Sequence, residues 1–274
     1  MRDNQSLMTI SYLVHQAGKV ASQTLEATLR VASDGQFRVE RHHYITDRQL
    51  DHLDRISRLP GAEMDMPSGV AEQVAVARAV RVEVIAQEPP GTLIVTGIRE
   101  PLSMSVAAFF QNLPVYCPWV DYAPEAAERT GAELVAFFNS QFDRVMLGRP
   151  PQTFGDALLD IKLRGIADWF DVEFKPCYGF DICDIRMPLE VSFVAFENNG
   201  RRFALYRSEQ LDLALPKLLT FAGLPRVPAV NVNVAAEKDY ADVYRCFKAR
   251  FRPTQAMSAF YQGTTFFRTF YCQG

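Results

Sequence analysis

The sequence lacks the cysteine and histidine patterns that hold structural zinc or a disulfide framework. Its five cysteines are an odd number without a Cys-x-x-Cys pair, and its four histidines do not reach a zinc-ligand spacing. This excludes a zinc module and a disulfide-stabilised scaffold, and it indicates free thiols in a reducing compartment. We therefore expect a cytoplasmic protein without a metal cofactor.

Neither a strong charge nor a long apolar run points to nucleic acid or a membrane. The formal net charge is only −3, so no overall electrostatic field would draw the chain to nucleic acid or to an anionic membrane. The apolar stretch from Leu7 to Val14 is too short to span a bilayer and lacks a small-residue cleavage site. Any anion-binding site must therefore be local, built from a few side chains and backbone amides.

What the sequence does contain is an alternation of strand and helix patterns. We find no internal repeat and no linker, so residues 1–274 are expected to form a single domain. Strand and helix patterns alternate through the first hundred residues, over 8–14, 22–32, 37–44, 46–59, 70–87 and 92–98. Strands separated by helices predict right-handed crossovers and a doubly wound α/β fold with a parallel sheet.

The rest of the chain is mainly helical. Residues 124–174 are helical and rich in aromatics, and two strands at 189–196 and 202–206 flank a hairpin turn at Asn198-Asn199-Gly200. Further helices are expected at 208–222, 236–251 and 254–270, with a short strand at 230–234. The aromatic residues near the C-terminus are consistent with core packing or with a homodimer contact.

The loop after the first strand combines features of an anion site. It contains Gly18 and Lys19, and Ser22 begins the following helix. Amides at a helix N-terminus and a lysine charge together bind phosphate-like groups. The loop is not a Walker A motif, because a single glycine precedes the lysine and Val20 follows it. On the motif alone, a solvent-exposed lysine in an ordinary turn is an equal alternative.

The segment Gln16-Ala17-Gly18-Lys19-Val20-Ala21-Ser22 resembles the 5'-phosphosulfate loop of sulfotransferases that use 3'-phosphoadenosine 5'-phosphosulfate (PAPS). Among these it is most similar to bacterial capsular polysaccharide synthesis proteins. The resemblance implies that Lys19 contacts the 5' phosphate and the leaving-group oxygen, and that Ser22 and Thr24 bind the phosphate. Gln23 stands where these enzymes often carry a second hydroxyl.

A second anion site is indicated at Arg99, which follows the strand 92–98 and precedes a proline and a helix. Ligands bind at the carboxyl ends of parallel strands, and arginine can donate two hydrogen bonds to one phosphate. Arg-x-Pro before a helix resembles the 3'-phosphate signature of sulfotransferases. The family's serine eight residues later is Ala107 here, so Ser103 or Ser105 would have to supply the hydroxyl. Without the resemblance, an ion pair between Arg99 and Glu100 or another carboxylate is favoured.

His43 is the candidate general base. It ends the second expected strand, and it resembles by position a histidine that precedes an aromatic residue in glycan-modifying sulfotransferases. A structural histidine at a strand end is the alternative interpretation, and Glu40 and His15 are weaker candidates.

Further stretches extend the resemblance along most of the chain. Leu205 to Leu211 resembles a strand-to-helix segment common in sulfotransferases, and residues 237–241 match the Asn-Lys-Trp-Tyr-Ser signature of the capsular group at the lysine and the tyrosine. The resemblance implies a P-loop-like parallel sheet flanked by helices, with a helical middle insertion. It also implies sulfuryl transfer from PAPS to a hydroxyl of a glycan or another small molecule, leaving PAP.

Two other functions remain open. A P-loop nucleotide kinase is disfavoured by the incomplete Walker A loop and by the absence of an acidic residue at the end of the strand 92–98. A non-catalytic sulfotransferase-like binding protein is suggested by Gln23 and Ala107, which replace expected hydroxyls. The identity of the acceptor cannot be read from the sequence.

Overall fold

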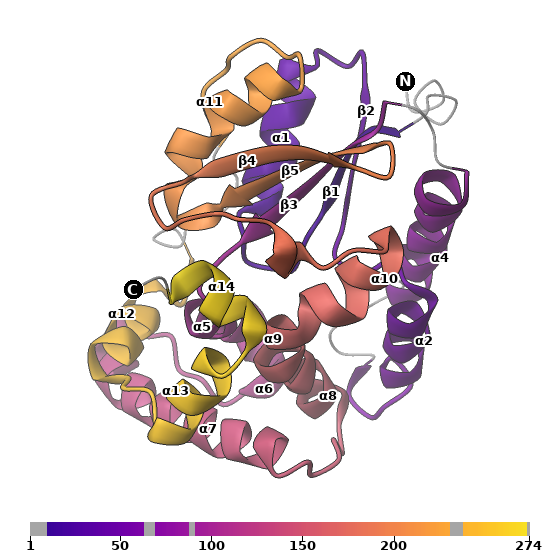
Figure 1. The fold of residues 1–274 in the computed structure, drawn as a ribbon. Helices are drawn as coiled ribbons and strands as arrows, with labels where there is room; N and C mark the ends of the chain where they lie inside the picture. The colour runs from indigo at the N-terminus through magenta and orange to yellow at the C-terminus, as the bar shows by residue number, and fades with distance from the viewer. Residues whose placement is uncertain (1–9, 63–68, 88–90, 231–237, 273–274) are drawn as a thin grey trace.

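The computed structural model describes residues 10–62, 69–87, 91–230 and 238–272, except the side chains of 69–71. Five strands form one sheet in the order β2-β1-β3-β5-β4 (Figure 1). The strands are β1 (Ile10–His15), β2 (Arg38–His42), β3 (Leu93–Ile98), β4 (Phe193–Asn198) and β5 (Arg201–Arg207). β2, β1, β3 and β5 run parallel, whereas the edge strand β4 pairs antiparallel with β5.

The antiparallel edge strand corrects the expectation of a parallel sheet. The expected turn makes this strand pair a hairpin, because Asn199 has φ 49° and Gly200 has φ 74°. Two consecutive residues with positive φ fit the right-handed twist of a hairpin, so β5 returns antiparallel beside β4. The fold is therefore a mixed α/β sheet flanked by helices.

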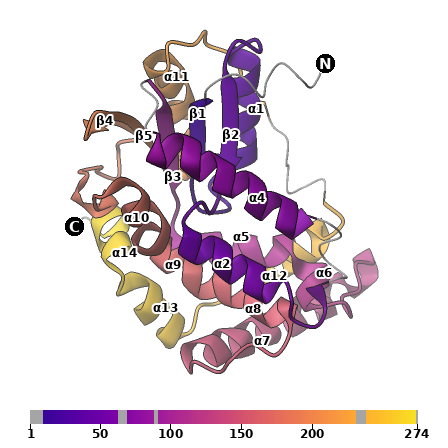
Figure 2. The same ribbon diagram turned by 90° about the vertical axis from the view of Figure 1, so that its right-hand side faces the viewer.

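Alternating side chains of the strands face two layers of helices. Tyr12 and Val14 of β1 pack with α1 (Ser22–Ala32) and α11 (Leu211–Phe221) in one buried cluster. Leu13 packs in another cluster with α4 (Gly69–Arg81), its π-helical extension η2 (Val82–Ala86) and residues of the middle helices. This separation follows from the two-residue period of a strand. Seen from the side, α4 crosses in front of the strands and α2 (Asp47–Ile56) lies below it (Figure 2).

A helical region extends from the carboxyl ends of the parallel strands (Figure 1). Its own core joins residues of elements far apart in the sequence, including Phe109, Phe138 and Phe247. The elements of this region, with the 3-10 turns omitted, are α5 (Pro101–Gln111), α6 (Leu113–Tyr116), α7 (Ala127–Met146), α8 (Phe154–Asp160), η4 (Ile161–Gly165), α9 (Ile166–Trp169), η5 (Phe170–Phe174), α10 (Lys175–Tyr178), α12 (Ala241–Arg250), α13 (Gln255–Gln262) and α14 (Thr265–Tyr271).

Most expected elements are confirmed, and α1 has the expected bounds of 22–32. The expectation of one helix at 254–270 was wrong: this stretch forms two helices, because Thr264 caps a new one by accepting a hydrogen bond from the Phe267 amide. Within that stretch Tyr261 and Phe270 are buried, as core residues would be. The expected strand at 230–234 lies outside the described residues except for Val230, as do residues 8–9 of the first strand and 236–237 of the helix 236–251.

In the described part of the chain no helix is both long and apolar enough to cross a bilayer. All five cysteines are free.

Candidate functional site

One cavity of about 320 Å³ collects most of the residues that the sequence singles out. It lies where β1, β2 and β3 end, and Lys19, His43 and Arg99 each follow one of these strands. The full lining is Lys19, Ala21, Ser22, Gln23, Thr24, Arg41, His43, Arg99, Ala107, Phe110, Gln111, Tyr240 and Tyr244. Because the parallel strands end at the same edge of the sheet, Lys19 and Arg99 meet here although they are 80 positions apart in the sequence.

The loop between β1 and α1 has an unusual backbone. Lys19 and Ala21 adopt left-handed conformations, with φ 70° and 62°. For residues with a Cβ this conformation costs roughly 1–2 kcal/mol each. The sequence named Gly18, together with Lys19, as part of the anion-binding loop. The structure does not support Gly18 as a binding residue, because it does not line the cavity, and the positive φ angles of the loop belong to Lys19 and Ala21.

The side chain of Tyr206, from β5, contacts this loop through its hydroxyl. Its hydroxyl lies 2.9 Å from Gln16 Oε1 and donates to the carbonyl of Val20. The ring can cross β3 only because residue 97 is glycine: a Cβ there would lie 2.6 Å from Tyr206 Cζ. A glycine on one strand and a tyrosine on the next therefore hold the loop in its left-handed shape.

The N-terminus of α1 opens into the cavity without a side-chain cap. Ala21 occupies the N-cap position, and the first turn contains no acidic residue. Ser22, Gln23 and Thr24 line the cavity at this end. The first amides of a helix have no partner within it, and they carry the positive end of the helix dipole. This terminus is therefore suited to an anion.

The N-terminus of α5, which lies beside the predicted anion site at Arg99, is capped by a side chain, whereas that of α1 is not. Glu100 caps it by accepting hydrogen bonds from the amides of Leu102 (3.1 Å) and Ser103 (2.6 Å). Both carboxylate oxygens of Glu100 thus bind amides of α5, and Glu100 does not form the ion pair with Arg99 that the sequence offered as an alternative. At this position the guanidinium of Arg99, and not the helix terminus, is left for an anion.

Arg99 joins the two parts of the cavity. Its Nη1 donates to the Lys19 carbonyl oxygen (2.9 Å) and its Nη2 to Ser103 Oγ (3.1 Å). No ion pair to Arg99 occurs among the described residues. Ser105 is corrected as a binding candidate, because it is fully buried and accepts a hydrogen bond from the Tyr261 hydroxyl (2.9 Å). Ala107, which replaces the family's serine, does line the cavity.

The cavity is cationic. Lys19, Arg41 and Arg99 line it, and none of its described lining residues is Asp or Glu. Burial, followed by the charges of Lys162, Arg99 and Lys238, lowers the pKa of Lys19 to about 8. A lysine held among other cations without a counter-ion is stabilised by a bound anion.

This pKa gives a pH dependence of anion binding. Lys19 loses its charge as the pH rises through about 8, so the affinity for a phosphate-bearing ligand should fall up to tenfold per pH unit above that value. Phosphate groups are themselves protonated below a pKa of about 6. Titration calorimetry with PAP should therefore find the tightest binding between about pH 6.5 and 8. A Kd that stays constant between pH 8 and 9.5 would contradict this expectation.

His43 lines the cavity, and both of its ring nitrogens have partners within the protein. Its Nδ1 donates to the carbonyl oxygen of Gln16 (2.8 Å), so the neutral ring carries its lone pair on Nε2, which lies 3.4 Å from Arg41 Nη1. Burial, opposed by the hydrogen bond to Gln16 and reinforced by Lys162 and Arg41, lowers the pKa of His43 to about 3. The imidazole is therefore neutral at physiological pH, as a proton acceptor must be.

The other histidine and carboxylate candidates do not reach the cavity. Glu40 pairs with Arg38 (3.0 Å) and lies 3.6 Å from His42. His15 is fully buried: its Nδ1 lies 2.8 Å from the Tyr178 hydroxyl and its Nε2 lies 3.1 Å from Glu173 Oε1. Neither group lines the cavity.

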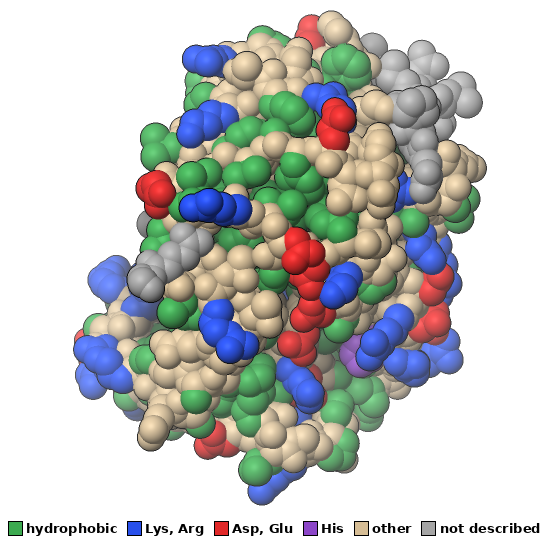
Figure 3. All heavy atoms as spheres, in the orientation of Figure 1, with side chains coloured by type: hydrophobic (Ala, Val, Ile, Leu, Met, Phe, Trp, Pro, Cys, Tyr) green, Lys and Arg blue, Asp and Glu red, His purple; other side chains and the backbone are tan. Residues whose placement is uncertain are grey.

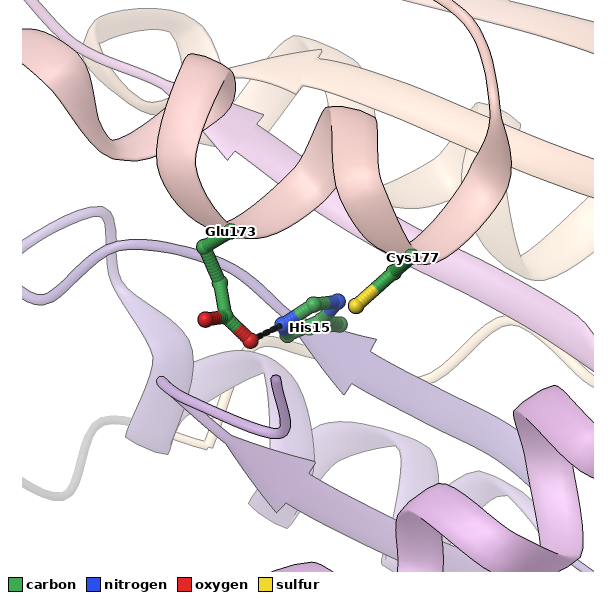
Figure 4. A group of neighbouring side chains, drawn as sticks. All are labelled: His15, Glu173 and Cys177. Atoms are coloured by element: carbon green, nitrogen blue, oxygen red, sulfur yellow. Dashed lines mark hydrogen bonds and ion pairs between the residues drawn. The ribbon is translucent and has the colours of Figure 1, made fainter. Parts of the chain in front are cut away.

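His15, Glu173 and Cys177 form a buried cluster whose ligand-type atoms lie within 4.8 Å of one another (Figure 4). The sequence missed this cluster because His15 and Glu173 are 158 positions apart. Glu173 Oε1 also accepts hydrogen bonds from the amides of Ile45 (2.5 Å) and Thr46 (3.0 Å), and Oε2 accepts one from Thr46 Oγ1 (2.6 Å). Every polar atom of the imidazole and the carboxylate thus has a partner, and burial raises the pKa of the Cys177 thiol. The cluster is best explained as a structural network that fixes the chain beyond His43.

An aromatic wall that the sequence did not assign to the site closes one side of the cavity. It consists of Phe110, Tyr240 and Tyr244, and the rings of Phe110 and Tyr244 lie 4.7 Å apart. Tyr240 belongs to the stretch that resembles Asn-Lys-Trp-Tyr-Ser, of which residue 237 lies outside the described part. That resemblance was the signal that could have placed Tyr240 here. Aromatic faces of this kind pack well against a planar base.

Comparisons with known proteins give one match. The family model NKWYS, described as "Putative capsular polysaccharide synthesis protein", matches residues 159–272. This stretch is less than half of the 274-residue chain. It includes Tyr240 and Tyr244 of the cavity, whereas Lys19, His43 and Arg99 lie before it. No curated protein and no solved structure matches the chain.

Proposed function

We propose that this protein is a sulfotransferase that moves the sulfuryl group of PAPS onto a hydroxyl of a carbohydrate or another small molecule. The observation that carries the proposal is that Lys19 and Arg99 reach one cationic cavity at the carboxyl ends of the parallel strands. PAPS carries a phosphosulfate at its 5' position and a phosphate at its 3' position, so it needs two separate anion sites. The similarity to the capsular polysaccharide family supports a carbohydrate acceptor.

Each part of the cavity has a role in this proposal. Lys19 and the open amides of α1 bind the 5'-phosphosulfate, with Ser22 and Thr24 at the same end. Arg99 binds the 3' phosphate, to which it can donate two hydrogen bonds. The aromatic wall of Phe110, Tyr240 and Tyr244 contacts the adenine. The proposal implies the sulfotransferase type of P-loop-like fold for this sheet.

Transfer is then an in-line displacement at sulfur. The acceptor oxygen forms a bond to sulfur while the bond from sulfur to the 5'-phosphate oxygen breaks, and the electron pair of that bond stays on PAP. Lys19 stabilises the charge that develops on this phosphate oxygen. His43 Nε2 takes the proton of the acceptor hydroxyl once Arg41 Nη1 has moved from Nε2 to the anionic ligand, because the ring's own proton is held on Nδ1 by Gln16. Bound PAPS brings negative charge close to His43, which raises its pKa toward the range of an effective base.

The experiment is incubation with PAPS and a panel of saccharides, followed by mass spectrometry. Products that gain one sulfuryl group, formed together with PAP, support the proposal. The His43→Gln variant should bind PAP normally but lose roughly 10²- to 10⁴-fold in rate, as expected for the loss of a general base. An absence of PAP binding at saturating concentrations would rule the proposal out.

Ala107 offers a test by gain of affinity. Its side chain lines the cavity at the position where the sulfotransferase signature carries a serine. Ala107→Ser should therefore strengthen PAP binding by about three- to tenfold, the value of one added hydrogen bond. The matched control is Ala108→Ser, because Ala108 is buried on the neighbouring position of α5 and does not line the cavity. Unchanged or weaker PAP binding by Ala107→Ser would place the 3' phosphate elsewhere.

The natural alanine at position 107, where the sulfotransferase signature has a serine, supports one alternative. This is a sulfotransferase-like protein that binds a nucleotide without transferring sulfate. PAP binding without transfer to any acceptor would favour it. A P-loop kinase has less support, because such enzymes hold magnesium with a carboxylate, and the described lining of the cavity has none.

A further inference from the structure

A second cavity of about 340 Å³ lies between α2 and the segment formed by α8, η4 and α9. On this side of the molecule Lys and Arg side chains gather beside a histidine over α2 (Figure 3). The residues that line the cavity are Tyr44, Arg48, Gln49, His52, Arg55, Asp160, Ile161, Arg164, Gly165, Asp168 and Val172. None of them belongs to the first cavity.

Two arginines of α2 leave this cavity with uncompensated positive charge. Arg48, His52 and Arg55 are spaced to lie on one face of the helix. In the described part of the chain neither Arg48 nor Arg55 has a hydrogen bond or an ion pair through its side chain. Burial and the charge of Arg55 lower the pKa of His52, with Asp160 opposing and Arg48 adding to the effect.

The carboxylates of the cavity do not neutralise these arginines. Asp160 is held by Arg144, from outside the cavity, and Asp168 lies 4.0 Å from Arg164. A ligand that places a carboxylate between Arg48 and Arg55 would gain two charge-assisted contacts without displacing an existing ion pair.

The remaining lining suits a sugar. Gln49 and Asp168 can exchange hydrogen bonds with hydroxyl groups, whereas Tyr44, Ile161 and Val172 offer an apolar surface to the face of a pyranose ring. A lone phosphate would use the arginines but not these groups. The combination fits a saccharide that carries a carboxylate.

The two cavities are neighbours along the chain. His43 lines the first and the next residue, Tyr44, lines the second. Ile161 of η4 also lines the second cavity; its neighbour Lys162 lines neither cavity, and the Lys162 side chain has no hydrogen bond or ion pair with another described residue. Its charge acts on both Lys19 and His43, so it stands close to the first cavity as well. Tyr44 therefore connects the lining of the second cavity to His43, the candidate base, through a single peptide bond.

We infer that the second cavity binds the acceptor, and that this acceptor is a saccharide bearing a carboxylate, a uronic acid, held by Arg48 and Arg55. The role of this saccharide as the acceptor rests on the proposed function. Its binding to the second cavity does not, and it can be measured without any turnover.

The test is titration calorimetry with a glucuronic acid tetrasaccharide and with the matched neutral glucose tetrasaccharide. The native protein should bind the acidic saccharide at least tenfold more tightly than the neutral one. Arg48→Gln combined with Arg55→Gln should remove this preference and leave the Kd of PAP unchanged. Both side chains are exposed, so the double variant should keep its melting temperature. The control is Arg226→Gln, which removes the same charge from an exposed residue outside both cavities.

The outcomes separate the two proposals. Equal affinity for the acidic and the neutral saccharide, or a preference that survives the double variant, overturns the inference even if PAP binds and sulfate is transferred. A preference for the acidic saccharide that is lost in the double variant but kept in Arg226→Gln supports the site. If PAP does not bind in the same experiments, the proposed function is refuted, whereas the saccharide site stands.

Discussion

Lys19→Met is expected to weaken PAP binding about 100-fold while it stabilises the free protein. A hydrogen bond to a charged group contributes roughly 1.5–3 kcal/mol, and Lys19 lines the cavity just before Ala21, the N-cap of α1. In the free protein burial, followed by the charges of Lys162, Arg99 and Lys238, lowers the pKa of the same ammonium to about 8. Below this pH the folded state holds a charge that it disfavours, so a neutral side chain should raise the free energy of unfolding by about 1 kcal/mol.

Calorimetry with PAP and thermal unfolding without ligand measure the two effects of this substitution separately. Lys217→Met is the matched control, because Lys217 is an exposed lysine on α11 and is not part of the cavity. It should change neither quantity. A Lys19→Met variant that binds PAP within a factor of three of the native protein would contradict the role given to this lysine.

Glu173→Ala is expected to cost about 3–5 kcal/mol of stability, the largest effect of any single substitution considered for the fold. The carboxylate is fully buried and accepts from the amides of Ile45 and Thr46, from the Thr46 hydroxyl, and pairs with His15. Its removal would leave all these buried groups without an acceptor. In a chain of this size the melting temperature should fall by about 10 °C.

Thermal and urea unfolding measure this loss. Glu190→Ala is the control, because Glu190 is exposed and has no side-chain contact with another described residue. A change of less than about 1 kcal/mol in Glu173→Ala would show that the network around His15 does not hold the chain beyond His43 in place. Zinc added to the native protein should not raise its melting temperature, since His15 and Glu173 already have partners.

The sequence predicted the parts of the molecule that depend on local signals. The bounds of α1 follow from its helical spacing, and the buried run of β3 identifies a central strand. Because parallel strands end at one edge of a sheet, the residues after β1 and β3 were expected to meet, and the structure brings Lys19 and Arg99 into contact. Whether they bind a nucleotide stays a prediction.

What the sequence could not provide depends on contacts between distant residues. The charge of Lys162 acts on Lys19 only because the middle helices fold back over the strand ends, and no local pattern marks this lysine. Ser105 looked available until the packing of α13 placed the Tyr261 hydroxyl on it. The left-handed conformations of Lys19 and Ala21 had no local signal, because they depend on the contact of the Tyr206 hydroxyl with the Val20 carbonyl. In each case tertiary packing outweighed the local preference.

The central claim is that Lys19 and Arg99 bind the two phosphates of one nucleotide, and nucleotide selectivity tests it most directly. Calorimetry should compare PAP with adenosine 5'-phosphate, which lacks the 3' phosphate, in the native protein and in Arg99→Met. The native protein should bind PAP at least tenfold more tightly, and Arg99→Met should bind both nucleotides equally. Equal binding by the native protein, or a preference for PAP that survives in Arg99→Met, would contradict the account.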